Sequence, residues 1–66
     1  MTPTTEITLT GGIRYRVQGD AGDVERVVLD AARGSIMELA WLIDAETGDR
    51  VGFNPAFVVT LRSVSP

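Results

Sequence analysis

The chain contains no cysteine, no histidine and no lysine. Without cysteine it forms no disulfide, and without cysteine and histidine it lacks the ligands of the usual zinc sites. The same absences remove the commonest general base and the strongest side-chain nucleophile of enzymes. We therefore predict that the chain is not an enzyme and that it uses no cofactor and no metal. A small hydrolase that relies on carboxylates is the remaining catalytic alternative.

Positive charge is also scarce. The six basic residues are all arginines, and nine carboxylates outweigh them to give a net charge of −3. That balance disfavours general adhesion to nucleic acid or to an anionic membrane. The longest apolar stretch, residues 39–43, is too short to span a bilayer, and the first residues lack the pattern of a secretory signal. We expect a cytoplasmic protein, and the lack of lysine together with many alanine, valine and glycine residues suggests a bacterial genome rich in GC.

A chain of 66 residues predicts one small domain, residues 1–66, near the lower limit for independent folding. We expect residues 1–5 and 63–66 to be frayed. Small domains often compensate for a limited core with disulfides, a metal or self-association. Because this composition excludes disulfides and the usual zinc sites, self-association is the compensation that remains.

Apolar and polar residues alternate along much of the chain, which is the pattern of half-buried strands. The alternation predicts strands over residues 6–10, 13–18 and 35–44, followed by two more. Gly11-Gly12 suits the tight turn of a first hairpin, and Glu46-Thr47-Gly48 suits the turn of a second. The later Asn-Pro pair ends a strand, because proline has no amide hydrogen to donate to a sheet.

Residues 20–33 have helical spacing instead. Four apolar residues follow the spacing i, i+3, i+4, i+7 and form one stripe, at Val24, Val27, Val28 and Ala31. Asp20 stands where an N-cap is needed. The predicted fold is therefore α+β, in the order ββαβββ, with one helix packed on one face of a small antiparallel sheet.

The odd-numbered residues of every predicted strand are expected to face the helix, with Trp41 at the centre of the core. Replacing Trp41 with alanine should then cost about 3–5 kcal/mol of stability. The even-numbered face carries most of the arginines and an apolar strip. We predict that contacts are made there by Arg14, Arg16, Leu42, Arg50 and Arg62, so that Leu42→Asp should weaken association without unfolding the monomer.

An apolar strip rimmed by arginine is typical of protein–protein contacts, and the open edges of a small sheet invite partners. We therefore predict a non-enzymatic protein-interaction or regulatory module that forms a homodimer, or binds another protein, through its sheet. The alternative is a nucleic-acid-binding accessory protein that uses the arginine-rich face, because arginine suits phosphate. That face has no predicted exposed aromatic side chains on which bases would stack.

The second turn is acidic, with Asp44, Glu46 and Asp49 close together in the sequence. A calcium loop needs more oxygen ligands and a longer loop than this. The acidic residues therefore indicate a solvated hairpin tip.

Two segments carry a resemblance to a known family. Residues 8–17 with the helix after them, and residues 48–58 with their Asn-Pro pair, resemble segments of the small flagellar FlbD-like proteins. In that family the Asn-Pro segment comes first, whereas here it comes last. The chain also resembles small actinobacterial proteins of unknown function arranged strand–helix–strand–strand. The resemblance implies a small αβ module and transfers no catalytic residue.

Overall fold

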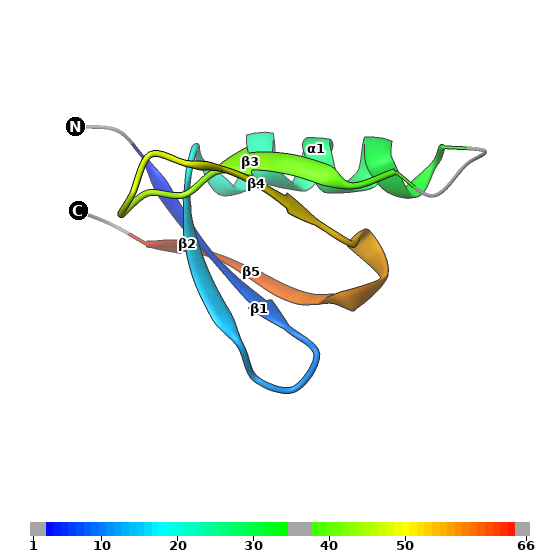
Figure 1. Cartoon of the computed structure of the whole chain (residues 1–66), viewed down its shortest axis with the longest axis horizontal. Helices are drawn as coiled ribbons and strands as arrows, with labels where there is room; N and C mark the ends of the chain where they lie inside the picture. Colours follow the sequence, from blue (N-terminus) through cyan, green and yellow to red (C-terminus); the bar gives the residue numbers. More distant parts are fainter. Residues whose placement is uncertain (1–2, 35–37, 65–66) are drawn as a thin grey trace.

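The computed structural model of this protein describes residues 3–34 and 38–64. The elements follow in the order β1 (Thr4–Leu9), β2 (Arg14–Gln18), α1 (Ala21–Ala32), β3 (Ala40–Ile43), β4 (Arg50–Phe53), a short 3-10 helix η1 (Pro55–Phe57) and β5 (Val58–Val64) (Figure 1). The predicted α+β class and the order ββαβββ are confirmed. Residues 35–37 of the strand predicted over 35–44 lie outside the described residues.

The strands form two antiparallel sheets, one of three strands in the order β2-β1-β5 and one formed by β3 and β4. The expectation of a single sheet is wrong. The two sheets meet where Val17 bridges Asp44 and where the Ala45 amide donates to the Arg16 carbonyl at 2.9 Å. Beyond this point they diverge, so that α1 and the β3–β4 hairpin form an upper layer over β1, β2 and β5 (Figure 1).

The hydrophobic core lies between these two layers. Its buried residues come from α1, from both sheets and from all strands except β5, and they are Ile7, Val17, Val24, Val28, Ala31, Ala40, Leu42 and Phe53. Three of the four residues of the predicted helical stripe are among them. One polar residue, Thr5, is also fully buried, and its hydroxyl donates to the Gly19 carbonyl at 2.9 Å. That hydrogen bond offsets the cost of removing the hydroxyl from water.

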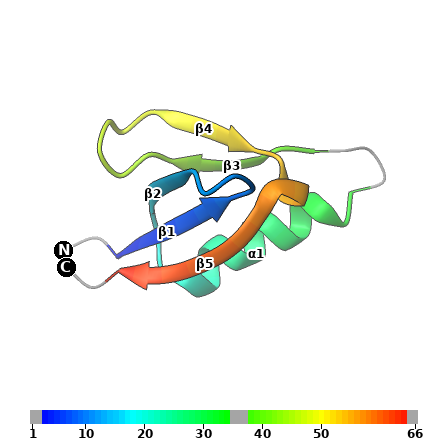
Figure 2. The same cartoon turned by 90° about the horizontal axis from the view of Figure 1, so that it is seen from below.

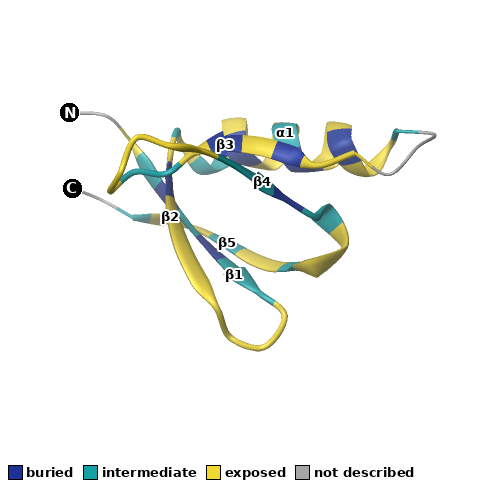
Figure 3. Ribbon diagram, in the orientation of Figure 1, coloured by how far each residue is buried: buried dark blue, intermediate teal, exposed yellow. Residues whose placement is uncertain are grey.

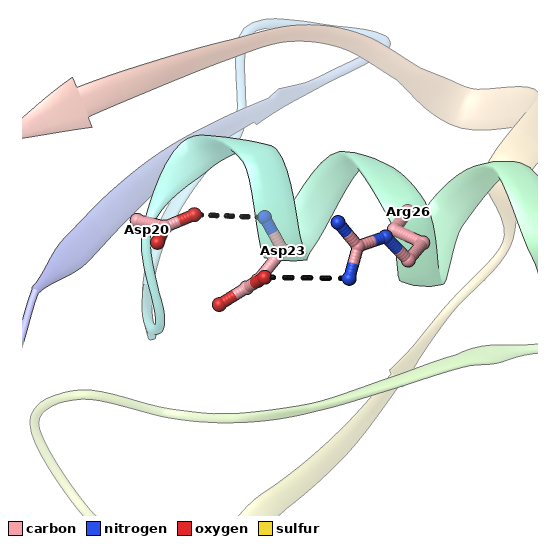
Figure 4. Close-up of polar contacts among 3 residues, drawn as sticks. All are labelled: Asp20, Asp23 and Arg26. Atoms are coloured by element: carbon pink, nitrogen blue, oxygen red, sulfur yellow. Dashed lines mark hydrogen bonds and ion pairs between the residues drawn. The ribbon is translucent and has the colours of Figure 1, made fainter.

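The start of α1 is fixed by its predicted cap. Asp20 has an extended backbone, and its carboxylate accepts a hydrogen bond from the Asp23 amide at 2.8 Å (Figure 4). Asp23 in turn pairs with Arg26 across one turn at 3.7 Å, with both side chains exposed. The cap satisfies an amide that the first turn of a helix leaves without a partner.

β3 faces the opposite way from the prediction. Ala40 and Leu42 are buried, with Leu42 only 7% exposed, whereas Trp41 is 48% exposed (Figure 3). The bridge between the sheets explains this, because paired residues of antiparallel strands lie on the same face. Val17 faces the core, so Asp44 and the even residues of β3 face it too. The predictions that Trp41 centres the core and that Leu42 lies on the open face are wrong.

β5 also departs from simple alternation. Thr8 pairs with Thr60, but Leu9 pairs with Val58, so Val59 is an extra residue in the ladder. A bulge of this kind shifts which residues face inward. Val58 and Leu61 pack against the core, while Val59, predicted to be buried, is exposed.

The predicted frayed ends are shorter than expected. Thr4 and Thr5 belong to β1, where Thr4 pairs with Gln18 on one side and Val64 on the other. Ser63 and Val64 accordingly belong to β5. The prediction of fraying is wrong for these four residues.

The first hairpin turns at Gly11 and Gly12, both with positive φ, as predicted. Beyond the bridge to β3, this hairpin extends away from the upper layer, and its far end is exposed (Figure 3). Ile13 and Tyr15, which were expected in the core, are therefore exposed.

No helix within the described ranges is long and apolar enough to cross a membrane.

Because Leu42 faces the core and Trp41 faces solvent, we expect truncation of Leu42 to cost more stability than truncation of Trp41. Leu42→Ala should lower the free energy of unfolding by about 2–5 kcal/mol, because it opens a cavity in the core. Trp41→Ala should cost only about 1 kcal/mol, because half of this side chain is already in water. Urea denaturation of both variants measures the two costs. A larger loss for Trp41→Ala than for Leu42→Ala would contradict this orientation of β3.

Candidate interaction surface

The five residues predicted to make contacts fall into three separate places. Arg14, Arg16 and Arg62 alternate with the core-facing residues of β2 and β5, so they lie on the outer face of the three-stranded sheet. Arg50 lies on the outer face of the β3–β4 hairpin, in the other layer. Leu42 is in the core. The structure therefore does not unite these residues in one arginine-rimmed strip.

A carboxylate occupies the centre of the arginine group. Glu6 pairs across the sheet with Arg16 on one side and Arg62 on the other. Its carboxylate lies 3.4 Å from the Arg62 guanidinium, and its side chain is only 12% exposed. Because the Arg62 side chain is mostly in water, this ion pair contributes no more than about 1 kcal/mol.

Further acidic groups border the same face. A hollow of about 290 Å³ is lined by Glu6, Arg14, Tyr15, Arg16, Asp44 and Glu46. Its charges are mixed, because the turn between β3 and β4 places two carboxylates beside two arginines. The outer face of the three-stranded sheet is therefore not the uniformly basic surface that a phosphate backbone requires.

The outer face of the β3–β4 hairpin is apolar instead. Leu39, Trp41 and Ile43 alternate with the buried residues of β3 and are 44%, 48% and 36% exposed. Arg50 and Gly52 lie opposite Ile43 and Trp41 on the neighbouring strand. We call these five residues, Leu39, Trp41, Ile43, Arg50 and Gly52, the Trp41 face.

Gly52 shapes the Trp41 face by having no side chain. A Cβ atom at this position would lie 2.9 Å from Cδ1 of Leu39 and 3.2 Å from Cη2 of Trp41. Contacts that short would force the neighbouring side chains to move. The glycine therefore allows Leu39 and Trp41 to lie flat across β4, toward the open edge of the sheet, which explains a residue that otherwise weakens a strand.

Arg50 completes the surface by stacking on Trp41. Its guanidinium carbon lies 4.7 Å from the centroid of the indole ring. Such a cation–π contact contributes about 0.5–1 kcal/mol at an exposed site. Within residues 3–34 and 38–64 Arg50 forms no ion pair, so its charge has no carboxylate partner there.

A second apolar surface lies at the projecting end of the β1–β2 hairpin. Ile13 and Phe57 are exposed there, and with Leu9 and Thr10 they line an open hollow of about 330 Å³. Tyr15, farther along β2, packs edge-on against Phe53 with ring centroids 5.2 Å apart. This second apolar surface is the alternative to the Trp41 face as a site of apolar contact with a partner.

In the acidic turn, the Asp44 carboxylate is hydrogen-bonded to backbone amides of the turn itself. One carboxylate oxygen of Asp44 accepts hydrogen bonds from the amides of Glu46 and Thr47, at 2.7 and 3.1 Å. Gly48 closes the turn with a positive φ, as its place in the sequence predicts. Among the residues that the structure describes, no three acidic side chains form a group that could hold a metal ion.

Comparison of the chain with protein families, curated proteins and solved structures finds no match. The resemblance to FlbD-like proteins therefore stays a prediction, and function is argued from the surface alone. Sequence reasoning missed Leu39, Trp41 and Ile43 as surface residues, because it assigned all three to the core. Gly52 was the available signal, because a glycine within a strand often marks a place where other groups approach the backbone closely.

The role of Gly52 is testable, because Trp41 is the only tryptophan of the chain. Gly52→Ala should shift the fluorescence emission of Trp41 to longer wavelength, since the new methyl group lifts the indole off β4 into water. Gly22→Ala, a matched change on α1, should leave the emission unchanged. An unchanged spectrum for Gly52→Ala would show that the ring does not lie over this strand.

Proposed function

We propose that this chain is a small non-enzymatic protein-interaction module that associates with itself through the Trp41 face. The observation that carries the proposal is the exposure of three large apolar side chains beside an arginine on one face. Contiguous apolar surfaces rimmed by polar groups mark interaction sites. Tryptophan and arginine are also the residues that most often dominate the energy of an interface.

The size of the core favours a second copy of the chain as the partner. Eight apolar residues are buried in the part of the chain that the structure describes, and the chain has no cysteine to support them with a disulfide. Burying apolar area stabilises by about 25 cal/mol per Å². Association through the Trp41 face therefore adds to a core that is small, as expected for a domain of this length.

The nucleic-acid alternative has less support. Exposed Trp41 offers a ring on which a base could stack, but Arg14, Arg16 and Arg62 lie on the outer face of the other layer. Glu6 also lies between two of these arginines. A protein partner accounts for the apolar side chains of the Trp41 face without needing a basic track.

Sedimentation velocity over a range of concentrations tests the proposal. The natural chain should show a concentration-dependent shift from monomer to dimer. Trp41→Ala should raise the dissociation constant at least about tenfold, because it removes the largest side chain of the face. Phe57→Ala, which truncates an exposed aromatic of the second apolar surface, should leave the dissociation constant unchanged.

Three results would contradict the proposal. The natural chain remaining monomeric at the highest concentration would exclude self-association. A loss of association in Phe57→Ala but not in Trp41→Ala would assign the contact to the second apolar surface. Retardation of single-stranded DNA that weakens steeply with salt would favour the nucleic-acid alternative.

A further inference from the structure

We infer that the second copy joins β4 edge to edge, so that two antiparallel β4 strands unite the two hairpins in one four-stranded sheet with Val51 of each copy on the dyad. The inference rests on the proposed self-association and specifies its geometry. It follows from the state of the sheet edges, from the direction of the free backbone groups and from the match of side chains.

β4 offers an open strand edge among the described residues. The edge of β2 is partly covered, because the Ala45 amide bonds to Arg16. The edge strand β5 carries a bulge at Val59, a device that discourages pairing. β4 contains no proline and no bulge, pairs in regular register with β3 alone, and forms the outermost strand of the molecule (Figure 2).

The direction of the free groups on β4 follows from its hairpin. The Asp44 amide donates to the Asp49 carbonyl at 2.8 Å. Hydrogen-bonded and non-bonded pairs alternate along an antiparallel ladder, so Val51 and Phe53 direct their amides and carbonyls toward β3. Arg50 and Gly52 direct theirs outward, to the open edge.

These groups select the register of the two strands. Residues that pair across an antiparallel dyad must lie on the same face of the sheet, so the dyad passes through a residue and not between two. With Val51 on the dyad, Arg50 of one copy faces Gly52 of the other. The amides and carbonyls of both residues then bond to one another in both copies, and no outward group within β4 is left unpaired.

The side chains fit the same register. On the inner face, Val51 of one copy meets Val51 of the other, and Leu42 beside each valine extends the contact into a continuous apolar row. On the outer face, Trp41 extends across Gly52 and so reaches the Arg50 of the second copy. No like charges stand opposite each other, because Arg50 faces a glycine. The pairing therefore places part of each Trp41 face, namely Gly52 and the Trp41 ring that lies over it, in the contact with the second copy.

Cysteine cross-linking tests the register, because the chain has no cysteine of its own. Val51 would form a non-hydrogen-bonded pair with its counterpart, with Cα atoms about 4.5 Å apart, which lies within the range of a disulfide. Val51→Cys should therefore form an interchain disulfide at least about tenfold faster than Thr60→Cys, a control at an exposed position of β5. Equal rates in the two variants would overturn the inference.

A proline on the open edge provides a second test. Arg50→Pro removes an outward amide without breaking a bond to β3, so the monomer should keep its circular dichroism spectrum. Compared with Arg50→Ala, which keeps the amide, Arg50→Pro should raise the dissociation constant at least about tenfold. Equal dissociation constants for the two variants would overturn the edge pairing.

The two proposals fail in different ways. If the natural chain dimerises, but Val51→Cys cross-links no faster than the control and Arg50→Pro associates like Arg50→Ala, then the edge pairing is wrong and self-association stands. If the natural chain stays monomeric, both proposals are wrong.

Discussion

The hydrogen bond from the Ala45 amide to the Arg16 carbonyl, with the neighbouring bridge between Val17 and Asp44, joins the end of β3 to the edge of β2. This contact decides which side of β3 faces the core. Because Val17 faces inward, the even residues of β3 face inward as well, and Trp41 turns to solvent. The candidate interaction surface is a consequence of that one connection between the sheets.

Small size then limits what the chain can do with its remaining apolar residues. Over residues 3–34 and 38–64, two layers built from one short helix and five strands bury eight apolar side chains, which leaves several large ones at the surface. Gly52 and Arg50 organise those of β3, the first by clearing space over β4 and the second by stacking on the indole. The second apolar surface, around Ile13 and Phe57, has no glycine or arginine in a similar role among the described residues.

The parts of the fold that could be predicted from the sequence are those encoded locally. The capping aspartate, the helical stripe, Gly11-Gly12 and Gly48 each act within a few residues of the structure that they specify, and the predicted element order is confirmed. The facing of β3 could not be predicted in the same way, because residues 39–43 are apolar on both faces and their orientation depends on a distant strand.

The wrong orientation predicted for β3 also affected the prediction of the candidate site. The reversed orientation of β3 placed Leu42 on the open face, and the expectation of a single sheet placed Arg50 on the same face as Arg14 and Arg16. Together these two errors produced a strip that does not exist. The bulge at Val59 is a further long-range effect, since it appears only when β5 pairs with β1. Tertiary pairing, and not local propensity, determined both outcomes.

We propose that the open side of the β3–β4 hairpin receives a second copy of the chain. Amide hydrogen exchange along β4 at low and at high protein concentration tests it most directly. The account predicts that the amides of Arg50 and Gly52 exchange fast in dilute solution and slow down as concentration rises, while those of Val51 and Phe53 are protected at both. Amides of Arg50 and Gly52 that exchange equally fast at both concentrations in the folded protein would contradict it.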